Sequence, residues 1–238
     1  MPIPQEVDHH YNIDPESYWT DNVLSTQENS IDSINQFLKG FTKKRALDIG
    51  SGMGNDLNAL KELGFQVVGI EPSKSFAEAS QKKFGFSNSE VLVQRLEESA
   101  FESESFDFIA FGAVLEHLPF PGKALEKAVN WLTTGGLLQI QVPNARWLTA
   151  RLVNTVYHIT SPGFVCNLSP RHAPYHLFEF TEASFRTFAK AHALDIVLLQ
   201  YDICDTMLPR WTNSLVKPYM RLTNTGMELN LLLQKKTK

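Results

Sequence analysis

Three glycines stand at alternating positions directly after a short apolar run, in the stretch ALDIGSGMG at residues 46–54. A glycine-rich turn after a strand lets backbone N–H groups approach a ligand closely, because glycine has no Cβ and adopts positive φ angles. Glu71 ends the next apolar run, where a carboxylate can accept hydrogen bonds from both hydroxyls of a ribose. These residues indicate a site for a nucleoside-containing cofactor.

The spacing of the glycines distinguishes between kinds of cofactor loop. A P-loop requires Gly-Lys-Ser/Thr after four spacer residues, and no lysine follows here to hold phosphate oxygens. The dinucleotide fingerprint, counted from Gly50, requires a third glycine where the chain has Asn55, and no Tyr-x-x-x-Lys pair of a short-chain reductase is present. The sequence therefore disfavours an NAD-dependent reductase.

Two groups of histidines supply candidate acid–base residues. Glu116 and His117 lie in the motif LEHL after an apolar run, and His172 and His176 lie in SPRHAPYHLFEF. A general base that removes the proton of a reacting hydroxyl accelerates a reaction by about 10²–10⁴-fold. The spacing of His172 and His176 also suits two metal ligands on one helix face, but prolines in that stretch disfavour a regular helix, so we expect no metal there. We expect these four residues to be the catalytic candidates, with Glu116 and His117 either acting on substrate or orienting the loop.

These residues must be positioned by alternating strands and helices. From Arg45 to Pro143, short aliphatic runs alternate with segments of helical periodicity, which is typical of βαβ units on a parallel sheet. An irregular segment of about 25 residues separates the last two strands and, being longer than ordinary loops, is expected to hold structure or cover a site. We expect strands at 45–50, 66–71, 90–94, 106–112, 137–143, 194–201 and 227–236, and helices at 29–41, 55–63, 74–84, 121–134 and 182–193.

The glycine run, Glu71 at the end of the second strand, SFDFIAFGAVLEHL and LTTGGLLQIQVPN together resemble the class I S-adenosylmethionine-dependent methyltransferases. The branch that contains the ubiquinone-biosynthesis O-methyltransferases is the most similar, and the resemblance covers roughly residues 40–200. It implies an α/β fold: a doubly wound, Rossmann-like sheet of seven mostly parallel strands with helices on both faces and the last strand antiparallel. It also implies S-adenosyl-L-methionine as cofactor and in-line transfer of its methyl group to a small acceptor, with oxygen as the expected atom. A cofactor-binding regulatory or assembly protein without turnover is the alternative.

The resemblance assigns roles around the methionine and ribose parts of the cofactor. Gly50, Gly52 and Gly54 would let the main chain approach the methionine. Asp48 would order the loop or meet the amino group, and Glu71 would hold the ribose hydroxyls. A loop of N–H groups without lysine or arginine suits a cofactor that has no phosphate.

The adenine part of the site is assigned in the same way. Leu96 and Glu97, after the third strand, would flank the adenine, and Phe111 and Gly112 would form the floor where the fourth strand ends. One position departs from the family pattern, because Arg95 stands where many relatives have an aspartate for the adenine amine.

Length and composition favour one domain with a cap. The chain has 238 residues and a formal net charge of −4, so a basic nucleic-acid surface is not expected. Cys166 and Cys204 are isolated, the N-terminus lacks an apolar leader, and no uninterrupted apolar stretch is long enough to span a bilayer, which together favour a cytoplasmic protein. We expect a single methyltransferase domain over 1–238, with an N-terminal lid (1–30), a cofactor-binding core (40–143), a substrate cap (144–180) and a C-terminal part of the sheet (181–238).

Two segments are candidates for covering the site. Tyr11, Tyr18 and Trp19 give the N-terminal lid aromatic side chains that can close over a cofactor or a flat acceptor. The stretch 147–159 has an apolar face interrupted by an arginine. In the ubiquinone-pathway relatives this place carries a membrane-touching segment. We expect the helix to pack on its own core, with peripheral membrane contact as the alternative.

Overall fold

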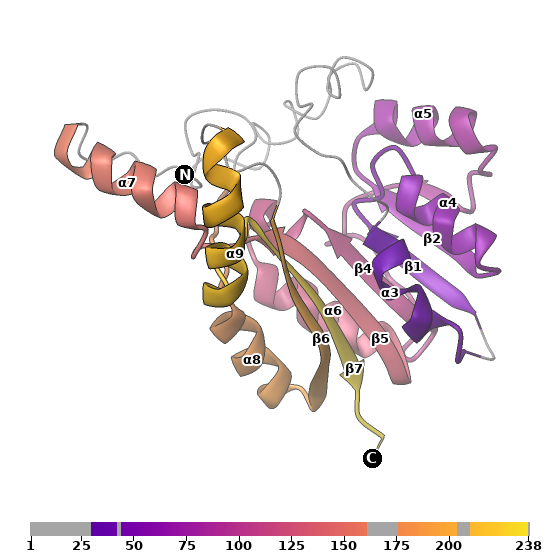
Figure 1. Ribbon diagram of the computed structural model, residues 1–238. Coiled ribbons are helices and arrows are strands. Elements are labelled where there is room, and N and C mark those ends of the chain that lie inside the picture. Colours follow the sequence, from indigo (N-terminus) through magenta and orange to yellow (C-terminus); the bar gives the residue numbers. More distant parts are fainter. Residues whose placement is uncertain (1–29, 42–43, 161–175, 204–209, 238) are drawn as a thin grey trace.

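The computed structural model describes residues 30–41, 44–160, 176–203 and 210–237. Within them the chain forms one seven-stranded sheet in the order β3-β2-β1-β4-β5-β7-β6 (Figure 1). Strand β7 runs antiparallel to both β5 and β6, and the other neighbours are parallel. This confirms the expected doubly wound sheet with an antiparallel last strand. The strands are β1 (Arg45–Ile49), β2 (Gln66–Glu71), β3 (Val91–Val93), β4 (Phe106–Gly112), β5 (Leu132–Pro143), β6 (Leu194–Asp202) and β7 (Glu228–Lys235).

Helices cover both faces of the sheet. On one face α3 (Ser30–Leu38), α4 (Asn55–Glu62) and α5 (Lys74–Phe84) share an apolar cluster with alternate residues of the strands. On the other face α6 (Pro121–Trp131) and α8 (Glu182–Ala191) share a second cluster. Because strand side chains alternate between faces, each buried strand contributes to both clusters, and this explains why its sequence is apolar throughout.

The boundary between α6 and β5 differs from the expected one. The helix ends at Trp131 rather than at residue 134, and β5 starts at Leu132. Leu132 pairs with Phe106 of β4, and a register irregularity follows before Leu137 pairs with Phe108. Pairing of Leu132 with a buried strand overrides the helical periodicity of residues 132–134. That periodicity carries no information about a bulge in a neighbouring strand.

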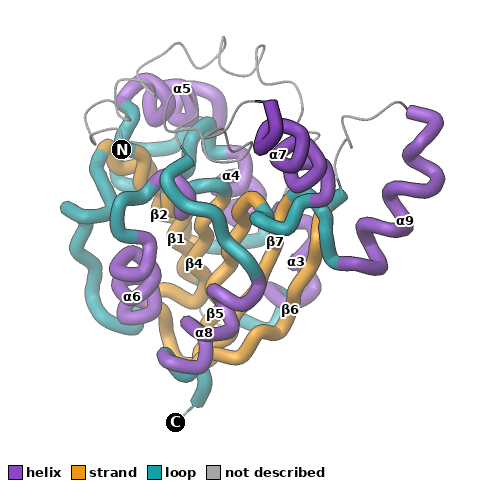
Figure 2. Tube along the Cα trace, turned by 90° about the vertical axis from the view of Figure 1, so that its left-hand side faces the viewer, coloured by secondary structure: helices purple, strands orange, loops and turns teal. Residues whose placement is uncertain are grey.

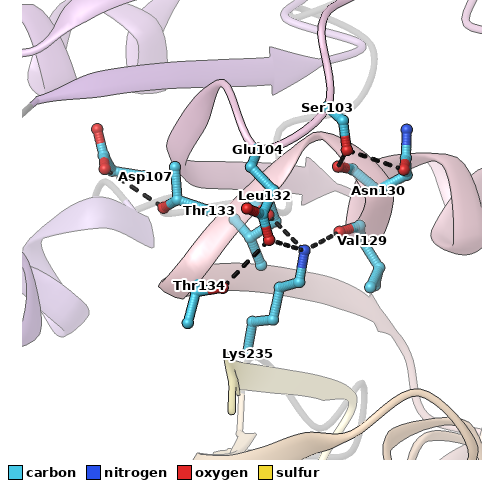
Figure 3. A network of polar contacts seen from close by, with 9 residues as sticks. All are labelled: Ser103, Glu104, Asp107, Val129, Asn130, Leu132, Thr133, Thr134 and Lys235. Atoms are coloured by element: carbon cyan, nitrogen blue, oxygen red, sulfur yellow. Dashed lines mark hydrogen bonds and ion pairs between the residues drawn. The ribbon is translucent and has the colours of Figure 1, made fainter. Parts of the chain in front are cut away.

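A polar network fixes this boundary to the last strand at the amino edge of the sheet (Figure 3). Lys235 Nζ, from the end of β7, donates to the main-chain oxygens of Val129 at 3.0 Å and Leu132 at 2.7 Å. The same ammonium forms an ion pair with Glu104 at 3.2 Å. A cation at the carbonyl end of a helix satisfies acceptors that have no helical partner, so Lys235 closes α6.

Two further helices lie beyond the carboxyl edge of the parallel strands. They are α7 (Leu148–Thr160) and α9 (Asn213–Thr223), and α9 confirms that the irregular segment before the last strand holds structure. Trp147 and Ala150, at the start of α7, pack with Met220 of α9. Figures 1 and 2 show both helices projecting from the sheet.

The packing expected for the helix at 147–159 is wrong for its outer part. Leu152, Val156 and Ile159 are 51%, 59% and 80% exposed. The physical reason is position, since α7 projects beyond the end of the sheet (Figure 1). Residues 1–29 of the expected N-terminal lid (1–30), including Tyr11, Tyr18 and Trp19, lie outside the described residues. The same holds for residues 161–175 of the expected cap, among them His172.

Candidate functional site

The polar residues of interest gather where the parallel strands end. Strand β1 lies between β2 and β4, and the chain crosses from one side of β1 to the other after β3. In open α/β sheets the ligand binds at such a switch point, outside the carboxyl ends of the strands. The loop after β1, the end of β2 at Glu71 and the end of β4 at Gly112 therefore border one crevice.

The glycine loop uses its three glycines for different purposes. All three have positive φ, at 73°, 50° and 75° for Gly50, Gly52 and Gly54. A Cβ on Gly50 would come within 2.5 Å of Val114 Cγ2, and one on Gly54 would reach Phe86 and Ser80 at 3.0 Å. Gly50 and Gly54 are thus required by packing, whereas a Cβ on Gly52 would meet only a backbone oxygen at 4.0 Å.

Glu71 holds the glycine loop in shape. Its Oε2 accepts a hydrogen bond from Gly52 N at 2.9 Å, and its Oε1 accepts one from Ser73 N at 2.8 Å. Each carboxylate oxygen has two lone-pair directions, so each keeps one for a ribose hydroxyl. Burial raises the pKa of Glu71, and the two N–H bonds oppose that shift.

The charges around the loop fit a cationic cofactor. Burial raises the pKa of Asp48 well above its usual range, and the nearby carboxyls of Asp56 and Glu71 raise it further. Three acids in one crevice disfavour a phosphate, whereas the sulfonium and ammonium of S-adenosylmethionine would favour the ionised forms of these acids. The buried Ser51 Oγ in the loop has no hydrogen-bond partner in the described part of the chain and packs over Gly69 of β2, beside Leu57.

The residues expected around the adenine differ in exposure. Leu96 is buried in the core cluster and Glu97 is exposed, and Lys127 Nζ donates to the main-chain oxygens of both at 2.9 Å. Phe111 is fully buried among the core residues beside α6, on the face opposite to Gly112. The side chain of Phe111 is thus not at the floor of the crevice, and its expected contribution is limited to the main chain. The adenine roles of Leu96 and Glu97 stay predictions.

The turn that follows β4 brings three catalytic candidates together. Glu116 and His117 lie on the short helix η1 (Leu115–His117), where Glu116 Oε1 is 3.9 Å from His117 Nε2. The rings of His117 and His176 pack edge to face, with centroids 4.9 Å apart. The main chain after His176 is attached to η1, since Leu177 N donates to Glu116 O at 2.7 Å. One ligand atom from each of Glu116, His117 and His176 lies within 4.8 Å of the others.

Glu116 is a buried acid in an unusual state. Only 1% of it is exposed, and its Oε2 has no hydrogen-bond partner among the described residues. Burial raises the pKa of Glu116 to about 8, and the charge of Glu228 adds to the shift. At neutral pH the group is therefore mostly protonated, and a cation or a donor beside it would favour its ionised form.

Backbone strain connects the catalytic turn to the glycine loop. Ala113 has φ 53°, in the left-handed region that non-glycine residues rarely adopt. Its N–H donates to Gln141 O at 2.9 Å, and Val114 then packs against the position of Gly50. The strained turn thus places η1 beside the loop after β1, and sequence patterns carry no signal for it.

The last two strands contribute polar residues that the sequence did not single out. Glu228 and Asp202 lie opposite each other on β7 and β6, and Gln141 Nε2 donates to Glu228 Oε2 at 2.7 Å. The available signal was Glu228 and Asn230 standing two apart in the otherwise apolar run MELNLLL.

Comparisons with known proteins agree with this geometry. The model of the methyltransferase domain family matches residues 25–198. An arsenite methyltransferase of Mus musculus is 30% identical over 109 residues, which are 40% of this chain and 29% of that protein. A ubiquinone biosynthesis O-methyltransferase of Bradyrhizobium diazoefficiens is 31% identical over 104 residues, 43% of this chain and 41% of that protein. The match thus spans less than half the length of either relative.

The solved structures agree on the fold. A SAM-dependent methyltransferase from Archaeoglobus fulgidus superposes with a TM-score of 0.65 at 16% identity, covering 92% of this chain and 99% of that one. The sheet order, the glycine loop and Glu71 account for that similarity in physical terms. The family match covers most of this chain. The chain therefore belongs to the class I S-adenosylmethionine-dependent methyltransferases, enzymes whose cofactor is S-adenosyl-L-methionine.

Proposed function

We propose that this chain transfers the methyl group of S-adenosylmethionine to an oxygen atom of a small-molecule acceptor. The observation that carries the proposal is the group that His176 forms with Glu116 and His117, the latter two on the turn that packs against the glycine loop. Bound S-adenosylmethionine would supply a methyl group on a sulfonium that is already a good leaving group. Positioning the acceptor in line with that methyl is then most of the catalytic task, worth roughly 7–11 kcal/mol.

The side chains divide this task among themselves. Glu71 would hold the cofactor's ribose through the lone pairs that its bonds to Gly52 N and Ser73 N leave open, and Asp48 would meet the amino group. His117 accepts the proton of the acceptor hydroxyl when Glu116 is ionised, and the Glu116 carboxylate then stabilises the protonated His117. The same three atoms of Glu116, His117 and His176 suit a divalent cation, so a dependence of the rate on added metal is part of the test.

Cofactor binding is tested by isothermal titration with S-adenosylmethionine and, separately, with NADH. We expect micromolar binding of the first and none of the second. Glu71→Gln replaces one acceptor oxygen by an NH₂ group, so its dissociation constant should rise by about tenfold or more, at 1.4 kcal/mol per factor of ten. Glu62→Gln, an exposed change on α4, is the matched control. Equal affinity in both variants would contradict the role of Glu71.

Turnover is tested by the formation of S-adenosylhomocysteine with catechol acceptors, with and without a chelator. His117→Ala should reduce kcat by about 10²-fold or more, the usual contribution of a general base, and leave the cofactor affinity unchanged. Binding of the cofactor without turnover of any acceptor would instead support the non-catalytic alternative.

We also propose that the chain contacts a membrane surface peripherally through α7. Among the described residues no helix combines the length and apolar character needed to cross a bilayer. Exposed apolar side chains nevertheless gather on α7 and α9, and neither helix contains an acidic residue. This α7–α9 surface, apolar and basic, has the composition of an interfacial element. It consists of Leu152, Val156 and Ile159 on α7 and Leu215, Tyr219 and Leu222 on α9.

A further inference from the structure

Two carboxyls face each other at the carboxyl edge of the parallel strands. Asp202 ends β6 and Glu228 begins β7, and the strand register makes them direct partners. Like charges in that position destabilise a sheet. No ion pair joins either carboxyl to a lysine or arginine within the described ranges. Burial raises the pKa of both groups, which reflects the missing counter-charge.

Beside this pair lie buried oxygen atoms that lack a donor. Asn230 is 3% exposed and projects from the same face of β7 as Glu228, two residues further along. Its Oδ1 has no hydrogen-bond partner in the described chain, and the same holds for Glu116 Oε2. A buried acceptor without a donor destabilises the folded chain. The complementary ligand is therefore one that donates hydrogen bonds.

Asn230, beside the carboxyl pair, lies at about a substrate's length from the end of β4. Gly112 at the end of β4 pairs with Gln141 on β5, and Gln141 pairs with Asn230 on β7. Neighbouring strands are about 4.8 Å apart, so the row from Gly112 to Asn230 spans roughly 10 Å. A single ring with a short side arm covers that distance. The charge of Glu228 also reaches Glu116, so the pair lies near the catalytic turn.

We propose that Glu228 and Asp202 anchor a protonated amine of the methyl acceptor, which makes the substrate a small hydroxyl compound bearing a cationic arm. The inference rests on the proposed function, because it assigns the substrate class of that same site. An ammonium group has three donors and a positive charge, and it would satisfy the carboxyls and Asn230 Oδ1 together. A carboxylate-bearing acceptor would meet like charges there and be rejected.

The test uses two catechols that differ mainly in the charge of the arm, dopamine and 3,4-dihydroxyhydrocinnamate. We expect kcat/KM to favour dopamine by about tenfold or more, since one like-charge contact costs at least 1.4 kcal/mol. Glu228→Gln is isosteric and keeps an oxygen for Gln141, and it should raise KM for dopamine about tenfold with little change in kcat. Asp202→Asn should act in the same direction. Glu126→Gln, which removes an exposed charge on α6, is the matched control.

Binding measured without turnover separates the two proposals. Dopamine is titrated into the protein saturated with S-adenosylhomocysteine. Binding that Glu228→Gln weakens supports the anchor even if neither catechol is methylated, in which case the proposed reaction fails alone. Methylation of both catechols at similar kcat/KM, or dopamine binding that is absent or equal in wild type and Glu228→Gln, overturns the anchor.

Discussion

Individual residues at the carboxyl edge of the parallel strands have a structural role and a proposed functional role at once. Gly50 and Gly54 lack a side chain because Val114, Phe86 and Ser80 occupy the space, whereas Gly52 exposes its main chain. Glu71 satisfies two loop N–H groups before any ligand arrives. A substitution here therefore perturbs the loop and the cofactor together, and isosteric changes are the informative ones.

Glu116 gives a residue-scale prediction about pH. Its pKa is raised from 4.5 to about 8. Below pH 4.5 the carboxyl is protonated in the folded and the unfolded chain. Between the two values only the unfolded chain ionises, so rising pH lowers the stability, by up to about 1.4 kcal/mol per pH unit. Glu116→Gln removes this loss. The free energy of unfolding of the variant should therefore increase relative to that of the wild type as pH rises from 4.5 to 8.

Urea unfolding at several pH values measures that gain. Glu126→Gln, an exposed substitution, is the control and should parallel the wild type at every pH. A difference between Glu116→Gln and wild type that stays constant with pH would show that Glu116 ionises normally in the folded protein.

At the scale of elements, the two edges of the sheet have different tasks. The carboxyl edge carries the loop after β1, η1 and the ends of β6 and β7. The amino edge carries the network in which Lys235 joins β7 to the end of α6 (Figure 3). The network around Lys235 shares no residue with the carboxyl edge. A substitution in that network should therefore change the stability without changing ligand binding.

Lys235→Met provides the element-scale prediction. It retains an apolar stem but removes the donor to Val129 O and Leu132 O, leaving helix carbonyls unsatisfied. We expect a loss of about 1–3 kcal/mol in the free energy of unfolding. Denaturant unfolding measures it, and the S-adenosylmethionine dissociation constant should not change. Lys236→Met, which removes a surface ion pair with Asp195, should cost less than about 1 kcal/mol. Equal losses in the two variants would argue against the capping role.

For the whole molecule, charge and apolar exposure are unevenly distributed. The chain has a net charge of −4, yet α7 and α9 contain basic residues and no acidic ones. The α7–α9 surface also projects beyond the sheet (Figure 2). An exposed helix surface that is apolar and basic suits an anionic lipid surface.

Vesicle binding tests this arrangement. The protein should co-sediment with vesicles containing phosphatidylserine and not with pure phosphatidylcholine, and added salt should weaken the binding. Ile159→Ser and Leu222→Ser should each reduce it about tenfold, since one inserted apolar side chain contributes about 1.5–3 kcal/mol. Phe120→Ser, at an exposed site outside the α7–α9 surface, is the control. Equal sedimentation of all variants would refute the contact.

The sequence by itself determined the local features of this protein. Strands β2 and β4 have the predicted limits, and the loop from Gly50 to Gly54 follows β1 as expected, because alternation, glycine spacing and strand ends are short-range patterns. The same patterns carried the family resemblance and hence the cofactor. The helix limit at residue 134 failed because pairing of Leu132 with Phe106 depends on a distant strand.

Only the tertiary structure decided which distant residues meet. His176 reaches His117 because Leu177 bonds to η1, and nothing in their separation along the chain implies that contact. Asp202 and Glu228 face each other because β7 inserts antiparallel between β5 and β6. The exposure of α7 follows from where the sheet ends. The cofactor loop is a local pattern and can therefore be predicted from the sequence. The acceptor side of the site joins residues far apart in the chain, so it depends on the order of the strands.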